Sequence, residues 1–188
     1  MAIAITISRL KSNLQTLSTF GRNPEGQGIT RSCWSPAHED ARAWLLARMA
    51  DAGLTTNVDP AGNTFGRLGS GGPAVITGSH IDTVPRGGPL DGALGVMAGL
   101  ECLQTIGEAG VKTRLPLVVA AWSDEEGRYG SLFGSRAFTG KLDAKAIPSL
   151  RSVDGESLVD AMARAGLNAL VAPKAQCDPK DLSAYIDR

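Results

Sequence analysis

The sequence predicts an α/β domain with a mostly parallel sheet and helices on both faces. Two observations support this. Residues 73–84 and 115–127 each contain a short apolar run that ends in polar residues, and the run from Leu115 to Trp122 does not alternate. Such runs are typical of parallel strands covered on both faces. Between them, residues 91–110 carry apolar side chains at helical spacing. Strand, helix and strand therefore form a βαβ unit.

Two helices are predicted before this unit. Residues 5–19 have apolar side chains at helical spacing, and a loop rich in glycine and polar residues follows. Ser35 followed by Pro36 is typical of a capped helix start, and Gly53 is typical of the residue just after a helix end.

Shorter elements complete the pattern. Residues 55–68 are typical of two short strands joined by a turn at residues 60–63. Residues 156–166 predict a short helix, and a further element begins near the end of the chain.

Composition excludes several classes of partner. Nineteen basic and nineteen acidic residues give no net charge, which argues against nucleic acid and anionic membranes. No run approaches the ~18 apolar residues that a membrane span needs, and the first residues do not resemble a signal peptide. Three widely spaced cysteines, Cys33, Cys102 and Cys177, favour reduced thiols with small buried side chains in a cytoplasmic protein.

Chemically useful side chains gather where the predicted strands end. His80 and Asp82 end the first central strand, Asp91 opens the helix, and Glu125 and Glu126 follow the second strand. The carboxyl ends of neighbouring parallel strands meet at one crevice. Imidazole and carboxylate groups are ligands of Zn²⁺ and similar ions. The sequence therefore predicts a metal site at this crevice.

Position suggests a role for each residue. Asp82 lies two residues from His80 and on the same side of the strand, so its carboxylate could accept the second ring N–H of the histidine. Asp91 has two oxygens and could bridge two metals. One of Glu125 and Glu126 could bind metal while the other takes a proton from water.

Each signal has an ordinary structural explanation when taken alone. A strand histidine is commonly a hydrogen-bonded core residue, Asp91 could be a helix N-cap, and an acidic run is commonly a solvated loop. Their joint position at the strand ends favours the metal site. The other histidine, His38, lies in the first turn of a capped helix and is expected at the surface.

Long motifs then show a family resemblance. They are GSHIDTVPRGGPLDGALGV (78–96), SDEEGRYGSLFGSRAFTG (123–140) and the upstream SPAHEDARAWLLARMADAGLTTNVDPAGNTFGRL (35–68). These resemble the N-carbamoyl-L-amino-acid hydrolases and allantoate amidohydrolases, which belong to the aminoacylase- and carboxypeptidase-G-like dinuclear metallohydrolases. The resemblance implies a zinc-exopeptidase-like catalytic domain.

The resemblance also assigns roles. It implies that His80 binds a first divalent metal ion, that Asp91 bridges two ions and that Glu126 binds the second. Glu125 is implied as the general base, and Asp82 as the partner that orients His80. The implied reaction is attack of activated water on an amide or ureido carbonyl.

The resemblance covers only part of the family's length. Family members are about twice as long, so residues 1–188 are expected to be the N-terminal part of the catalytic domain, incomplete at the C-terminus and without the inserted lid and dimerisation domain. Each metal would keep two protein ligands, whereas catalytic zinc sites typically hold three. We therefore expect little amidase activity from the isolated chain. A non-catalytic fragment or interaction module is the alternative.

Substrate and metal are implied only as classes. The expected substrate is a small molecule, an N-carbamoyl-L-amino acid, with allantoate or β-ureidopropionate as alternatives. The two metal ions could be Zn, Mn, Co or Ni. Full-length relatives are expected to form homodimers.

Overall fold

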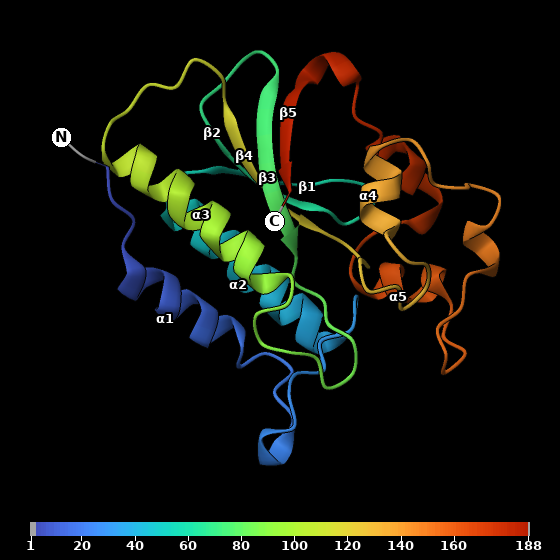
Figure 1. Cartoon of the computed structure of the whole chain (residues 1–188). Helices are drawn as coiled ribbons and strands as arrows, with labels where there is room; N and C mark the ends of the chain where they lie inside the picture. Colours follow the sequence, from blue (N-terminus) through green and yellow to red (C-terminus); the bar gives the residue numbers. More distant parts are fainter. Residues whose placement is uncertain (1–2, 188) are drawn as a thin grey trace.

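The computed structural model describes residues 3–187 and contains a five-stranded sheet in the order β1-β2-β4-β3-β5 (Figure 1). The strands are β1 (Thr55–Val58), β2 (Thr64–Leu68), β3 (Ala74–His80), β4 (Leu117–Trp122) and β5 (Leu182–Asp187). β3 pairs in parallel with β4 and β5, whereas β2 is antiparallel to β4 and β1. Four of the five strands therefore run in one direction, which confirms a mostly parallel sheet.

Three long helices lie on one side of the sheet and share one core. They are α1 (Ile7–Leu17), α2 (Pro36–Asp51) and α3 (Ala93–Glu108). Gly99 of α3 packs so closely that an added Cβ would lie 2.9 Å from the side chain of Val119, and at Gly66 of β2 an added Cβ would lie 3.0 Å from Met49 of α2. Val119 and Gly66 are register partners, so α2 and α3 lie against the same face. Glycines on helix and strand thus allow the close packing of this layer.

The opposite face has a smaller, aromatic cluster. The side chains of Ile76, Val118 and Trp122 are buried there. Phe138 of α4 (Phe133–Phe138) packs on Trp122 with ring centroids 5.0 Å apart. Helices therefore contact both faces, as predicted, but the three long ones lie on one side.

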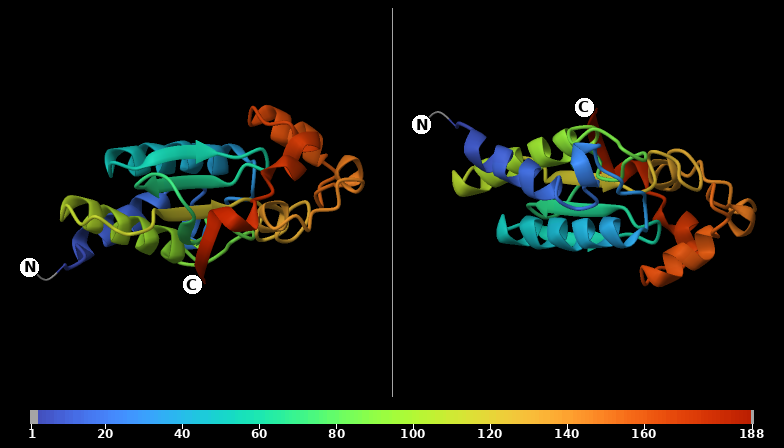
Figure 2. Two further views of the ribbon diagram at one scale, coloured as in Figure 1. Left: turned by 90° about the horizontal axis from the view of Figure 1, so that it is seen from above. Right: turned by 90° about the horizontal axis from the view of Figure 1, so that it is seen from below.

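The chain between β4 and β5 lies at one end of the sheet in both views of Figure 2, and its side chains form a second core. It contains α4, α5 (Leu158–Arg164) and the 3₁₀ helices η2 (Ile147–Ser149), η3 (Ala169–Ala175) and η4 (Pro179–Asp181). A further 3₁₀ helix, η1 (Pro24–Gly26), lies in the predicted N-terminal loop. Trp34 packs in this core edge-on against Phe133, at 5.5 Å between ring centroids. The loop before α2 is thereby fixed to the segment that follows β4.

Most predicted elements are confirmed, with shifts at their ends. Ser35 caps α2 by accepting a hydrogen bond from the amide of His38, and Gly53 follows the helix at φ +78°. The predicted helix at 91–110 begins only at Ala93, because Gly92 turns the chain at φ +64°. Asp91 therefore lies before the helix.

The prediction that His38 is a surface residue is wrong. Its side chain is 3% exposed, because the loop before α2 folds over the first helical turn. The amide of Trp34 donates to His38 Nδ1 at 3.3 Å, and His38 Nε2 lies 3.8 Å from Cys33 Sγ.

The cysteines are all unpaired, as predicted. Only Cys33 is buried; Cys102 on α3 is exposed and Cys177 is partly exposed, so the prediction of three buried side chains is wrong for two of them. Over residues 3–187, none of the helices combines the length and apolar character needed to cross a membrane.

Candidate metal centre

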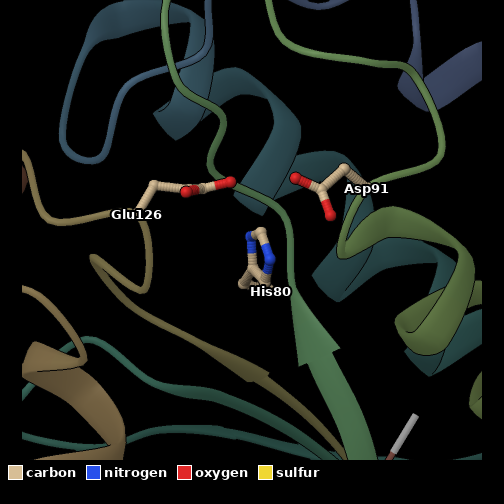
Figure 3. A group of neighbouring side chains, drawn as sticks. All are labelled: His80, Asp91 and Glu126. Carbon is tan, nitrogen blue, oxygen red and sulfur yellow. The ribbon is translucent and has the colours of Figure 1, made fainter.

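Three predicted ligands meet at the carboxyl end of the sheet. His80 ends β3, Asp91 lies in the loop before α3, and Glu126 lies in the loop after β4. Their ligand atoms all lie within 4.8 Å of one another. Figure 3 shows the two carboxylates extending toward each other from opposite loops, with the imidazole beside the gap. The convergence expected from the strand ends is therefore present.

The ring of His80 is held in one orientation. Its Nδ1 lies 2.9 Å from the main-chain oxygen of Asp82, which can only accept, so Nδ1 carries the proton in this bond. In the neutral ring, Nε2 is then the nitrogen with a free lone pair. The ring rests against Gly92, where an added Cβ would lie 2.5 Å from Nε2. Gly92 thus leaves the space that the imidazole fills.

Asp82 contacts the site through both its main chain and its side chain. The ring N–H of His80 reaches the carbonyl of Asp82, while carboxylate Oδ1 lies 3.6 Å from the same nitrogen. Carboxylate Oδ2 accepts a hydrogen bond from the amide of Glu126 at 3.1 Å. Oδ1 is buried and accepts no hydrogen bond within the described part of the chain. Asp82 therefore connects the loop of Glu126 to the end of β3.

The electrostatics of the cluster favour a cation. Burial lowers the pKa of His80, but the carboxylate and carbonyl of Asp82 and the charge of Glu126 outweigh burial and raise it to about 9. Burial and the neighbouring Asp91 raise the pKa of Glu126. One imidazole and two carboxylates form a ligand set that suits a divalent ion. The donor set, with the imidazole seated in the space at Gly92, therefore fits such an ion.

Asp124 shapes the loop that carries the two glutamates. It is fully buried and has φ +49°, a left-handed conformation that is uncommon for residues other than glycine. Its carboxylate accepts hydrogen bonds from the amides of Arg128 (2.7 Å), Tyr129 (3.0 Å) and Gly130 (3.1 Å). Its own amide donates to Cys33 Sγ at 3.1 Å. No separate role for Asp124 follows from the sequence alone; the available signal is an aspartate at a strand end followed by a glycine-containing loop.

Glu125 directly precedes Glu126 in the sequence, and its side chain is partly buried. Its Oε2 accepts a hydrogen bond from the hydroxyl of Ser135 at 3.3 Å. Gly134 packs against Asn63, where an added Cβ would lie 2.0 Å from Asn63 Oδ1. The stretch after the glutamates therefore supports their loop.

The turn at residues 60–63 forms hydrogen bonds with the end of β4 and with the segment that follows it. Asn63 Oδ1 accepts a hydrogen bond from the amide of Ser123 at 3.0 Å, and Nδ2 donates to the oxygen of Gly134 at 3.1 Å. Asp59 Oδ2 accepts from Asn63 Nδ2 at 2.8 Å and so fixes the amide orientation. The sequence predicted the turn at 60–63, but not its contacts with residues sixty positions away.

This turn predicts a pH dependence of stability. Burial raises the pKa of Asp59 from 3.8 to about 6, although hydrogen bonds from Asn63, Ala61 and Gly62 favour the charged form. The folded chain binds this proton more tightly than the unfolded chain, so the stabilisation is full below about pH 4 and lost as pH rises through about 6. Asp59→Asn is expected to reduce this loss by about 2 kcal/mol. Urea unfolding at pH 4 and pH 7 measures it, and an unchanged pH dependence in the variant would contradict it.

Known amidohydrolases match this chain over nearly its whole length. The chain is 40% identical over 185 residues to an N-carbamoyl-L-amino acid amidohydrolase of Geobacillus stearothermophilus, covering 95% of this chain and 44% of that protein. It is 36% identical over 186 residues to an allantoate amidohydrolase of Escherichia coli, again covering 95% and 44%. The chain thus spans a little under half the length of these relatives.

Solved structures agree with the sequence matches. A hydantoinase/carbamoylase family amidase from Burkholderia phymatum superposes with a TM-score of 0.89 at 43% identity, over 100% of this chain and 45% of that one. The resemblance predicted from the motifs is confirmed. The sequence pattern of peptidase family M28 matches residues 63–187, the segment that contains β2 to β5 and all three clustered residues, and the chain therefore belongs to peptidase family M28.

Proposed function

We propose that this chain forms part of a metal-dependent amidohydrolase that cleaves a C–N bond of N-carbamoyl-L-amino acids. The convergence of His80, Asp91 and Glu126 from three separate segments is the observation that carries the proposal. The name of the Geobacillus relative, at 40% identity, supports the substrate class.

Two divalent ions, chosen among Zn, Mn, Co and Ni, would be held here. His80 and Asp91 would hold the first ion, and Asp91 and Glu126 the second, with Asp91 bridging them. When bound, such ions make water more acidic and polarise a substrate carbonyl. The hydrogen bond from His80 Nδ1 to the main chain turns Nε2 toward the cluster in the neutral ring.

Glu125 is proposed as the general base. It follows the buried Asp124 and precedes Glu126, so the loop that positions a ligand also positions the base. Its carboxylate would accept a proton from the attacking water and deliver it to the leaving nitrogen. The Ser135 hydroxyl, at 3.3 Å from Oε2, restrains this carboxylate. Asp82, through its bonds to His80 and Glu126, would act as a positioning residue.

The isolated chain is expected to turn over little substrate. Three ligand side chains shared between two ions give fewer protein ligands per ion than catalytic zinc sites usually have. The proposal is therefore tested in a chimera in which this chain replaces the matching part of the Geobacillus relative.

The expected result is metal-dependent release of ammonia from N-carbamoyl-L-amino acids. Glu125→Gln in the chimera should lower kcat and leave metal affinity unchanged. Glu108→Gln, at a 53% exposed position on α3, serves as a matched control and should leave kcat unchanged. A folded, metal-loaded chimera without hydrolysis, or an active Glu125→Gln variant, would overturn the proposal.

Allantoate is the second candidate substrate, because the Escherichia coli relative is 36% identical over nearly the whole chain. The same chimera, assayed with allantoate and β-ureidopropionate, compares these substrates directly. We also propose a cytoplasmic location, with which three unpaired cysteines agree, and a homodimeric whole protein.

A further inference from the structure

A cavity of about 560 Å³ adjoins the candidate metal centre. Asp82 and Glu126 line its inner side, so the cavity lies directly beside the clustered residues. Its other walls come from the loop before α2 (residues 30–35), the loop after β3 and the turn at residues 152–156. The volume lies within the range of small-molecule sites.

Three apolar side chains in the lining, those of Val84, Pro85 and Val153, are exposed. Val84 and Pro85 come from the loop after β3, and Val84 is 43% exposed. Val153 comes from the turn and is 108% exposed, as much as in an extended peptide. The turn itself is defined, since the amide of Ser152 donates to the oxygen of Glu156 at 2.9 Å. A valine held on a defined turn adds nothing to the core, so its apolar surface is available to a ligand.

The cavity offers no free positive charge. Among the residues that line it, Arg128 is the basic one. Its guanidinium donates to Glu156 at 3.1 Å and to the main-chain oxygen of Cys33 at 3.2 Å, and it lies 3.6 Å from Asp154. These contacts neutralise Arg128, so the cavity suits an uncharged group better than a carboxylate.

We propose that this cavity receives the apolar side chain of the amino-acid amide substrate, with Val153 as a specificity-determining residue. The inference rests on the proposed function: Glu126 belongs to the cluster and also lines the cavity, so a substituent next to a carbonyl bound at the cluster can enter it. The substrate class is thereby narrowed to derivatives of apolar amino acids, such as leucine or methionine.

Binding to the metal-loaded chain tests this inference. Titration calorimetry compares N-carbamoyl-L-leucine, N-acetyl-L-leucine and N-carbamoylglycine, and amide NMR shifts show where each binds. The two leucine compounds should bind about fivefold to tenfold more tightly than the glycine compound. They alone should shift the amide signals of Val84 and Val153.

Val153→Ser should reduce this advantage and leave N-carbamoylglycine binding unchanged. The substitution is at an exposed position, so the fold should persist. Val111→Ser, at a 43% exposed valine that does not line the cavity, is the matched control.

The outcomes separate the inference from the proposed function. Equal binding of both carbamoyl compounds, unaffected by Val153→Ser, would overturn the inference and leave the proposed function standing. Tighter binding of both leucine compounds than of N-carbamoylglycine would support the inference, whereas the carbamoyl substrate class is decided separately by hydrolysis in the chimera. No binding of any compound to the folded, metal-loaded chain would overturn the inference, whereas the proposed function would still be decided by hydrolysis in the chimera.

Discussion

Replacing Gly92 with alanine is expected to weaken divalent-metal binding by about 100-fold. An added Cβ would lie 2.5 Å from Nε2 and Cε1 of His80, which is closer than real Cβ contacts allow. The imidazole would have to turn away from the cluster, and the ligand that it contributes would be lost. The same residue has φ +64°, which costs alanine a further 1–2 kcal/mol, roughly, of stability.

Gly53→Ala separates these two effects. Gly53 has φ +78°, but an added Cβ would have no atom within 4 Å. This control variant should therefore lose stability and keep metal affinity. Calorimetric titration with Zn²⁺ or Mn²⁺, together with urea unfolding of both variants, measures the difference. Metal binding of Gly92→Ala at the strength of the unsubstituted chain would show that His80 does not need this space.

Arg31→Met is expected to destabilise the fold by about 3–5 kcal/mol. The Arg31 side chain is 1% exposed. Its Nε donates to the oxygen of Ile81 at 2.6 Å, and Nη1 donates to the oxygens of Leu17 at 2.8 Å and Phe20 at 3.0 Å. Burial lowers the pKa of Arg31 to about 10, while the charge of Asp82 opposes that shift. Methionine would remove the cost of burying the charge, but it would leave these carbonyls without a donor and Asp82 without a nearby cation.

Arg67→Met is the matched control for this prediction. Arg67 also donates to three main-chain oxygens, those of Gly69, Gly71 and Gly72, but at the surface. Water can replace its hydrogen bonds, so the expected loss is within about 0.5 kcal/mol. Guanidinium unfolding of both variants gives the comparison. Similar losses for the two arginines would mean that burial of Arg31 has no special effect.

The parts of the fold that follow from local pattern were predictable. The apolar runs of β3 and β4 and the helical spacing between them identify the βαβ unit, because burial on both faces removes alternation. The carboxyl ends of neighbouring parallel strands share a crevice. This rule alone predicted that His80, Asp91 and Glu126 lie close together, before any distance was known.

Features that depend on contacts between distant segments were not predictable. His38 looked exposed because its helix position is polar, yet the preceding loop covers it. The start of α3 was placed at Asp91, because the backbone turn at Gly92 leaves no mark in hydrophobic periodicity. The hydrogen bond from the amide of Ser123 to the side chain of Asn63 joins positions sixty residues apart, and side-chain types alone do not reveal such pairs.

The sulfur of Cys33 offers a way to follow motion at this end of the sheet. It accepts a hydrogen bond from the amide of Asp124, which lies ninety-one positions further along the chain. Burial raises the pKa of the Cys33 thiol well above its usual range. Because Cys33 is buried against the loop that carries Asp124, an alkylating reagent is expected to modify it far more slowly than the exposed Cys102. The ratio of the two labelling rates is therefore expected to report how frequently the loop that carries Glu125 and Glu126 opens, with Cys102 as the internal reference.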